Sequence, residues 1–271
     1  MTNGNLARHL DHLRSSGPPF FTDRSVSEAL GQPPKVFLGD IVDLVNAGDA
    51  VCPQPGFYIL AEEGITGLDA DPRKWVHAYM GFLGIRYRMS HLCAAADFYG
   101  ASHQAIMSTH IVVPQDIPDI CTKYAKIFFL RQHPRMFAKV NRDPWLAHRK
   151  NGLIVASPEL TLFDLVDFAR SRSSETWLIG QITKDMGELV KPDRLKELAK
   201  CFPACIVRRL GYFLDLAELP PQADALRGFL SPKMRYIRLN PRVLEIPKLH
   251  PKYNVDERWK IIINDEIEYD I

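Results

Sequence analysis

Apolar residues in the first sixty positions recur at helical spacing in three short stretches, and a strand pattern follows them. The helical stretches end at Gly17, Gly31 and Gly48, and residues 57–60 have the aromatic and β-branched content of a strand. Helix, short helix, helix and a hairpin that closes on an aromatic strand is the order of a winged helix-turn-helix, in which the third helix reads DNA. The same order also builds many other small cores, so a DNA-binding role needs further support.

Longer elements begin at residue 71, and they mix helix with strand. Predicted helices cover residues 72–82, 90–99, 158–170, 175–189, 192–201 and 204–219, and predicted strands cover 110–114, 126–130, 153–156, 235–239 and 259–263. Ser90 is expected to cap the second of these helices. We therefore predict an α+β protein, with an N-terminal winged helix-turn-helix over residues 1–62 and a larger mixed α/β domain over residues 63–271.

The charge of the N-terminal part is unfavourable for DNA. Residues 1–60 hold four basic and six acidic residues, and four minus six gives a net charge of −2, whereas a duplex carries one negative charge per roughly 1.7 Å. The third helix offers Gln32 and Lys35 at its start and the wing offers Gln54, so these three are the candidate DNA contacts of this part. Asp40 and Asp43 lie further along the helix and would repel DNA if they faced it.

The strongest charge signal of the chain lies in residues 121–150. This segment holds eight basic residues and one acidic residue, and eight minus one gives +7. Aromatic residues such as Phe137 and Trp145 lie among the cations, a mixture that suits phosphate contact with occasional stacking. The alternative is that these cations form solvated faces that balance acidic segments such as the tail. Under the first interpretation the candidate DNA contacts here are Arg131, Arg135, Lys139, Arg142, Arg149 and Lys150.

Motifs for nucleotide binding and hydrolysis are missing from the sequence. It contains no P-loop, no G-x-G-x-x-G after a strand, no H-E-x-x-H and no G-x-S-x-G. Asp164 and Asp167 share one side of a predicted helix, where a hydrogen-bonding role between packed helices is commoner than acid catalysis. Cys201 and Cys205 lack a second Cys or His pair at zinc-site spacing. We expect no enzymatic activity, no metal and no cofactor.

The cysteines and the apolar runs bear on the cellular compartment. Five cysteines are scattered along the chain, and its start shows no charged-then-apolar leader, so we expect a cytoplasmic protein. The longest apolar runs fall far short of the roughly 20 residues that cross a bilayer. No membrane partner is expected.

Three parts of the chain contain sequence motifs that can be compared with those of known protein families. Residues 21–60 have the spacing of a winged helix with a glycine-aromatic pair that closes the wing, and residues 87–113 form a helix-glycine-glutamine-strand segment. The most distinctive pair consists of ASPELTLFDL at residues 156–165 and RRLGYFL at residues 208–214. Together these motifs resemble the AbiEi antitoxin family, the antitoxin half of abortive-infection type IV toxin-antitoxin systems.

The two distinctive motifs also have a physical interpretation. Ser157 suits the cap of a helix, and Glu159 places a carboxylate at the positive end of the helix dipole. Of the paired arginines Arg208 and Arg209, we expect one to serve an internal carboxylate such as Glu159 or Asp164. The other is expected to face DNA, and Arg208 is the candidate.

The resemblance implies an autorepressor whose winged helix binds inverted repeats in operator DNA upstream of its own operon, with the basic second domain strengthening the binding. It also implies phage defence through a nearby gene for a nucleotidyltransferase-like toxin, which this class counters without a stable protein complex. The acidic N-terminal part departs from this pattern, so operator binding here is weaker, uses the second domain or has been lost. Two alternatives stay open, namely a winged helix that binds a protein partner and a nuclease-like enzyme with a winged-helix targeting domain.

Overall fold

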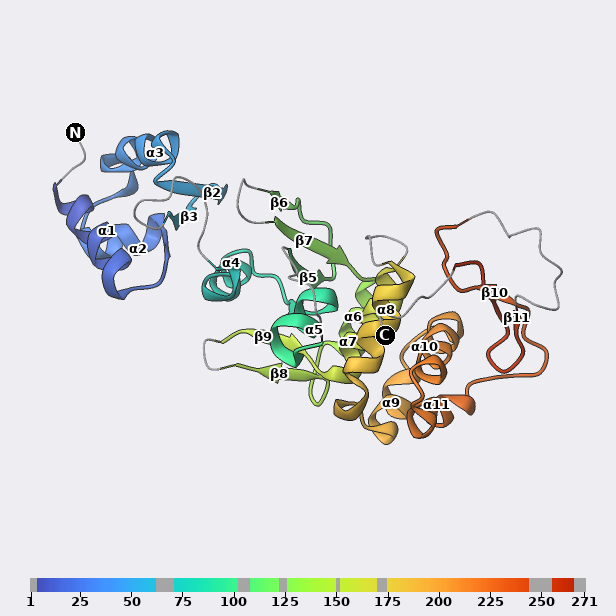
Figure 1. Ribbon diagram of the computed structural model, residues 1–271. Coiled ribbons are helices and arrows are strands. Elements are labelled where there is room, and N and C mark those ends of the chain that lie inside the picture. Colours follow the sequence, from blue (N-terminus) through green and yellow to red (C-terminus); the bar gives the residue numbers. More distant parts are fainter. Residues whose placement is uncertain are drawn as a thin grey trace.

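The computed structural model describes residues 4–61, 71–101, 108–121, 126–149, 152–169, 175–243 and 255–265. Figure 1 shows an elongated molecule with an N-terminal head, residues 4–61, at one end, a sheet in the middle and a helical part beyond it. Helices and several separate sheets confirm the α+β class. The predicted domain boundary after residue 62 falls outside the described residues and stays a prediction.

The head contains the three helices and the hairpin that the sequence predicts, with one additional strand, β1. Its order is α1 (Gly4–Ser16), β1 (Phe20–Thr22), α2 (Asp23–Leu30), the 3-10 turn η1 (Pro34–Val36), α3 (Leu38–Ala47), β2 (Ala50–Gln54) and β3 (Phe57–Leu60). Thr22 forms a capping box with Ser25 at the start of α2, and Gly31 ends that helix in the left-handed conformation with φ 63°. The strands form an antiparallel sheet in the order β1-β3-β2.

The two faces of β3 serve two different cores. Tyr58 and Leu60 pack with α1, α2 and α3 inside the head, whereas Phe57 and Ile59 belong to the core of the central part. The Phe57 ring packs against Tyr79 of the next helix, with ring centroids 5.2 Å apart. Because successive strand side chains point to opposite faces, one short strand fixes the head against the rest of the molecule.

The central part is built around a six-stranded mixed sheet in the order β6-β7-β5-β4-β9-β8. Its elements are η2 (Pro72–Lys74), α4 (Val76–Phe82), β4 (Arg88–Met89), α5 (His91–Tyr99), β5 (Thr109–Val113), β6 (Ile120–Cys121), β7 (Lys126–Arg131), α6 (Pro134–Val140), β8 (Leu146–His148) and β9 (Ile154–Ala156). The longest pairing joins β5 and β7 in parallel from Thr109 with Ile127 to Val113 with Arg131. Helix α6 follows β7 in the chain, and β7 lies between the edge strand β6 and β5.

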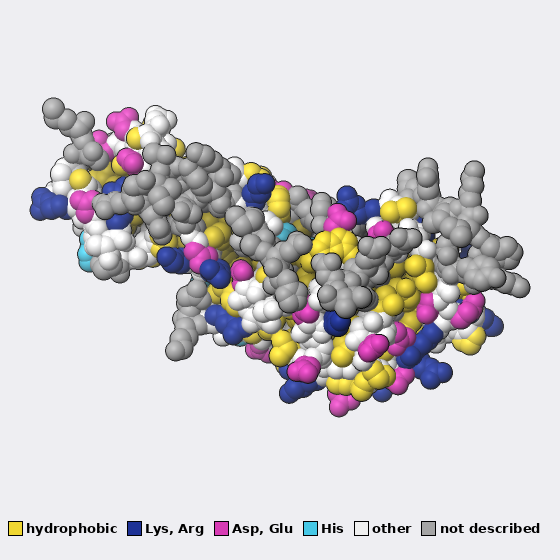
Figure 2. All heavy atoms as spheres, in the orientation of Figure 1, with side chains coloured by type: hydrophobic (Ala, Val, Ile, Leu, Met, Phe, Trp, Pro, Cys, Tyr) yellow, Lys and Arg dark blue, Asp and Glu magenta, His cyan; other side chains and the backbone are white. Residues whose placement is uncertain are grey.

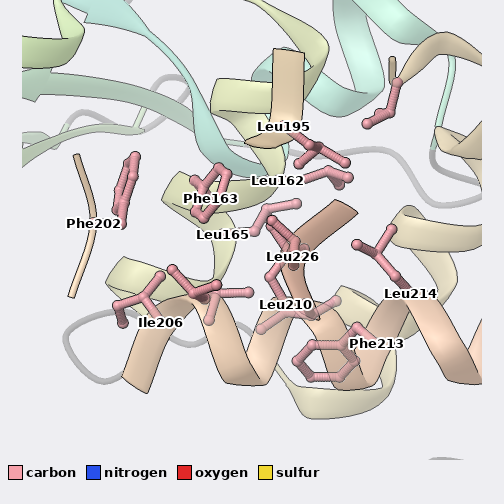
Figure 3. Packing of buried hydrophobic residues seen from close by; sticks show 14 of the residues in the cluster. Leu162, Phe163, Leu165, Leu195, Phe202, Ile206, Leu210, Phe213, Leu214 and Leu226 are labelled. Carbon is pink, nitrogen blue, oxygen red and sulfur yellow. The ribbon is translucent and has the colours of Figure 1, made fainter. Parts of the chain in front are cut away.

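The C-terminal part is a helical cluster around one almost fully buried helix. It contains α7 (Pro158–Phe168), α8 (Thr176–Asp185), η3 (Gly187–Leu189), α9 (Pro192–Ala199), α10 (Ala204–Leu216) and α11 (Pro220–Arg227), followed by a small sheet of β10 (Ile237–Arg238), β11 (Val255–Asp256) and β12 (Ile261–Ile262). Figure 3 shows Leu162, Phe163 and Leu165 of α7 packing with Leu210 and Phe213 of α10. Such an all-round apolar helix is stable only inside a core.

Two helices of the structure were not predicted, and two predicted helices are divided, one of which, 72–82, consists of the turn η2 and α4. α6 lies inside the basic segment and has seven residues, too few to show a helical period, and α11 follows a helix that was expected to run to residue 219. The predicted helix 175–189 consists of α8 and the turn η3. In the described part of the chain no helix has both the length and the apolar character needed to cross a membrane.

Candidate nucleic-acid interface

The basic segment forms its clearest surface feature on α6. His133 precedes this helix and accepts a hydrogen bond from the backbone nitrogen of Arg135, and Pro134 occupies the first turn, where its missing N–H is not needed. Phe137 is fully buried on the inner side. Arg135 and Lys139 are exposed and stand four residues apart, with Arg142 exposed three residues later. The four-residue spacing places Arg135 and Lys139 on one side of α6. Arg142 lies just past the end of the helix at Val140, and we call these three cations the α6 stripe.

A single buried arginine holds both ends of α6. Arg88 on β4 has no exposed surface, and its Nη2 donates a hydrogen bond to the Gln132 side-chain oxygen at 2.9 Å, immediately before α6. Its Nη1 donates to the Asn141 side-chain oxygen at 3.4 Å, immediately after α6. The guanidinium also lies 5.4 Å from the centre of the Phe137 ring. The stripe is therefore anchored from below by polar contacts at each end and an aromatic contact between them.

The charge of Arg88 is balanced by Asp164 of α7, which is equally buried. Arg88 donates from Nε to one carboxylate oxygen at 2.9 Å and from Nη2 to the other at 2.7 Å. Ser90 occupies the N-cap position of α5 as predicted, but its hydroxyl donates to the same Asp164 carboxylate at 2.5 Å and makes no side-chain capping bond. Buried charges need such pairing and additional hydrogen bonds. The structure thus gives Asp164 a hydrogen-bonding role, with a strand as its partner rather than a helix.

Asp167 lies one turn beyond Asp164, and its carboxyl group has a raised pKa. Burial raises the pKa of Asp167 to about 6, an effect that is partly opposed by a hydrogen bond at 3.0 Å from the Gln132 side chain. Gln132 therefore joins Arg88 and Asp167 directly below the start of α6. Arg88, Gln132 and Asn141 were not singled out in the sequence, because a lone arginine in a short apolar strand carries no local sign of its distant partners.

The other predicted cations of the second domain are engaged elsewhere or lie outside the described residues. Arg131 forms an ion pair with Asp116 at 2.8 Å between exposed side chains, and Arg149 lies over the Phe98 ring at 5.2 Å. Lys150 falls outside the described residues. In the described part of the face in Figure 2, Lys and Arg lie interspersed with Asp and Glu. Among the described residues, the cations of the +7 segment are therefore divided between the α6 stripe and contacts such as those of Arg131 and Arg149.

Arg208 does not belong to any surface. Its side chain is 4% exposed, and it donates hydrogen bonds to the backbone carbonyls of Trp259 at 2.7 Å and Lys260. The expected carboxylate partners are occupied by other arginines, because Arg88 binds Asp164 and Arg194 pairs with Glu159. The arginine expected to serve a carboxylate, Arg209, instead donates from Nε to the backbone carbonyl of Arg238 at 2.9 Å. We withdraw Arg208 from the candidate DNA contacts, since a side chain that braces the C-terminal sheet from inside cannot reach a phosphate.

The predicted contacts of the head lie apart from the α6 stripe. Lys35 is exposed and Gln32 half-buried at the start of the α3 region, and Gln54 is exposed at the end of β2. Gln54 also lines a hollow of about 220 Å³ together with Tyr79 and Asp116 of the central part. Figure 1 places α3 at the free end of the molecule and α6 near its middle. The structure therefore separates the predicted DNA contacts into two groups.

The structure offers no obvious centre for metal chemistry among the residues it describes. In that part of the chain, no three His, Cys, Asp or Glu side chains are grouped so that they could hold a metal ion. The free cysteines Cys201 and Cys205 are half-buried and pack beside the main core, as expected of small apolar residues. What the central part offers is a braced helix with a basic outer side.

A comparison with known protein families matches the part of the chain that contains α6. Residues 89–216, which contain α5 to α10, match the AbiEi antitoxin C-terminal domain. The chain carries an AbiEi-type antitoxin domain. This match confirms the resemblance carried by residues 156–165 and 208–214, and it supports the role of an antitoxin in a toxin-antitoxin system, which implies a cognate toxin.

A solved structure shares the fold of the whole chain. The crystal structure of the RV2827C protein from Mycobacterium tuberculosis superimposes with a TM-score of 0.67 at 16% identity, covering 98% of this chain and 93% of that chain. At this identity the likeness concerns the fold alone. No curated protein matches the sequence. The two chains therefore share one fold at low sequence identity.

Proposed function

We propose that this AbiEi-type antitoxin binds the operator DNA of its own operon and represses it, and that the α6 stripe provides the phosphate contacts. The observation that carries the proposal is the placement of Arg135 and Lys139 on one exposed side of α6, with Arg142 exposed just past its end, while Arg88 and Phe137 fix the other side of the helix. Phosphate contacts set the affinity and orientation of a protein on DNA. A rigidly held stripe provides them at little cost in side-chain and backbone ordering.

The proposal gives the protein a binding role in the cytoplasm and no catalytic one. Its implied partner is a nucleotidyltransferase-like toxin encoded nearby, countered without a stable complex as part of phage defence. The family match supports the antitoxin role, and the α6 stripe supports the DNA contact. Gln32, Lys35 and Gln54 stay predictions for a contribution of the head to operator binding, and Arg131, Arg149 and Lys150 for a contribution around the stripe.

The α6 stripe can be tested by the salt dependence of DNA binding. Each phosphate contact contributes a slope of about −0.9 to the plot of log affinity against log salt, so replacing all three cations by alanine should reduce the slope by roughly 2.7. The experiment is a fluorescence-anisotropy titration of a duplex from upstream of the gene at several salt concentrations. An unchanged slope in the triple variant would show that these side chains do not contact phosphate.

The matched control removes three equally exposed cations from another helix. Lys191, Lys196 and Lys200 lie on or beside α9 and are exposed. The triple alanine variant at these positions changes the net charge by the same amount, so a purely long-range electrostatic effect would appear equally in both. The proposal expects the slope to change in the α6 variant alone. Absence of any salt-sensitive binding by the wild-type chain would remove DNA binding from the proposal.

A second candidate function is favoured by the surface of α3. A helix that reads DNA normally presents polar or basic side chains, yet α3 exposes Leu38, Val42 and Asp43, and the turn before it exposes Val36. Aliphatic side chains donate no hydrogen bonds to bases or phosphates, and a carboxylate repels phosphate. These residues favour the protein-interaction role of the head.

A further inference from the structure

The interior beneath α6 holds one arginine between two carboxylates. In the described part of the chain, the charged groups that act on Asp167 are Arg88 of β4 and Asp164 of its own helix, and both are fully buried. From the segment that leads into α6, the neutral amide of Gln132 donates a hydrogen bond to Asp167 at 3.0 Å. One positive charge minus two negative charges gives this group a net charge of −1 when all three side chains are ionised.

The hydrogen bonds are shared unequally between the two carboxylates. Asp164 accepts both bonds of the Arg88 fork, at 2.9 and 2.7 Å, and a third from Ser90. Asp167 accepts from Gln132, whose own side-chain oxygen accepts from Arg88 at 2.9 Å. Hydrogen bonds and an opposite charge favour the ionised form of a carboxyl group, whereas burial opposes it. Asp167 is therefore the less compensated carboxyl, and burial raises its pKa to about 6.

Asp167 lies close behind the surface for which we propose DNA binding. Its partner Gln132 comes immediately before His133, the cap of α6. Phe168, the next residue of α7, packs with Phe137 of α6 in one buried cluster, and Figure 1 shows the two helices next to each other. A helix with its side chains is about 10–12 Å across, so a phosphate on the outer side of α6 lies roughly that far from the Asp167 carboxylate. A negative charge at that distance disfavours the ionised form of Asp167.

We propose that Asp167 takes up a proton from solvent when α6 binds DNA, so that operator binding is linked to pH. The inference rests on the proposed function and adds a residue that sets its affinity without touching DNA. By linkage, if the bound state holds the proton more tightly than the free state, binding is strengthened as the pH falls. At pH 8 the carboxylate is ionised and repels the phosphates, and at pH 5 it is neutral and the repulsion is absent.

Coulomb's law sets the size of this effect. At an effective dielectric constant of about 20, one phosphate roughly 11 Å away changes the protonation equilibrium of a carboxyl group about tenfold. Screening by salt reduces the change to roughly threefold. We therefore expect Asp167 to strengthen operator binding by about three- to tenfold between pH 8 and pH 5.

The test is a fluorescence-anisotropy titration of the full chain with the duplex from upstream of the gene, at constant salt, from pH 5 to pH 8. Asp167→Asn is neutral at every pH and keeps an oxygen that can accept from Gln132. The variant should bind about three- to tenfold more tightly than wild type at pH 8, and the two affinities should converge at pH 5. Histidines gain charge in the same range and are present in both proteins, so the ratio of the two affinities isolates Asp167.

A matched control removes the same charge at a distant, exposed site. Asp224 lies on α11 with its side chain 60% exposed, and Asp224→Asn should follow the pH profile of wild type. If Asp224→Asn strengthened binding at pH 8 as much as Asp167→Asn, net charge would explain the effect and the proposal would be overturned. A ratio of wild-type to Asp167→Asn affinity that stays constant from pH 5 to pH 8 would also overturn it.

Calorimetry counts the proton directly. Binding enthalpies measured at pH 6.5 in two buffers with different heats of ionisation should show that wild type takes up roughly a quarter to a half of a proton more per chain than Asp167→Asn. Equal uptake by the two proteins would overturn the link to Asp167 and leave DNA binding by the α6 stripe standing. If the wild-type chain instead shows no salt-sensitive DNA binding at any pH, the proposed function fails and the link fails with it.

Discussion

Removing the carboxylate of Asp164 should destabilise the protein strongly. Asp164→Ala leaves the Arg88 guanidinium fully buried with Gln132 and Asn141 as neutral partners, and it removes three hydrogen bonds, those at 2.9 and 2.7 Å from Arg88 and that at 2.5 Å from Ser90. Removing one partner of a buried ion pair typically costs about 3–5 kcal/mol, because the remaining charge is uncompensated. We expect a loss of that size in the free energy of unfolding.

Urea unfolding followed by tryptophan fluorescence measures this loss. Since whole domains are stable by roughly 5–15 kcal/mol, the measurement should be made at low temperature, where a weakened variant stays folded. Asp164→Asn keeps the side-chain volume and one acceptor oxygen, and it should lose less than Asp164→Ala. The double variant R88M/D164L replaces both charges by apolar groups and should recover most of the stability.

A surface ion pair provides the control for this experiment. Asp224 and Arg258 form a pair at 2.6 Å, with side chains 60% and 35% exposed. Asp224→Ala should cost less than about 1 kcal/mol, because solvent screens such pairs. A loss below about 1 kcal/mol for Asp164→Ala, similar to that of the control, would refute the argument that the buried pair with Arg88 holds α6 in place.

Three further predictions concern single positions. Gly211→Ala places a methyl group against the buried Trp259 ring and should cost about 1–3 kcal/mol or more in urea unfolding, whereas Gly228→Ala enters open space and should be neutral or slightly stabilising. Ser157→Ala removes the cap of α7 and should lower the free energy of unfolding by about 1 kcal/mol. The raised pKa of Asp167 means that its ionisation opposes folding above pH 6 and that this effect fades as the pH falls toward 4. Asp167→Asn should therefore stabilise the protein at pH 8, by at most about 3 kcal/mol, and by much less at pH 4; an equal effect at both pH values would contradict the shift.

Local signals predicted the head well. The glycines at 31 and 48 end α2 and α3 in the left-handed conformation, and Thr22 caps α2 through its own side chain. Each of these features depends on residues within one helical turn, so sequence alone is sufficient. The start of α7 at Ser157 was predicted for the same reason. By contrast, α6 has seven residues in a basic segment, and a helix that short is stabilised by what lies beneath it.

Contacts between distant segments were the part that sequence could not supply. Arg88 binds Asp164 across 76 positions, and Arg208 reaches the carbonyl of Trp259 across 51. A sequence shows that an arginine needs a partner, but not which of many carboxylates or carbonyls folding brings close. This is why Arg208 was assigned to DNA and Arg88 was not considered. The motif at 208–214 is recognisable because it braces the fold, which says nothing about contact with a ligand.

Counting charges along the chain also overstated the basic surface. Of the eight cations in residues 121–150, Arg131 is paired with Asp116 and Arg149 covers an aromatic ring, while three stand together on and beside α6. A net charge sums over both sides of every element, whereas a phosphate responds to cations on one side only. Among the described residues of this segment, the cations gathered in one place are therefore the three of the α6 stripe.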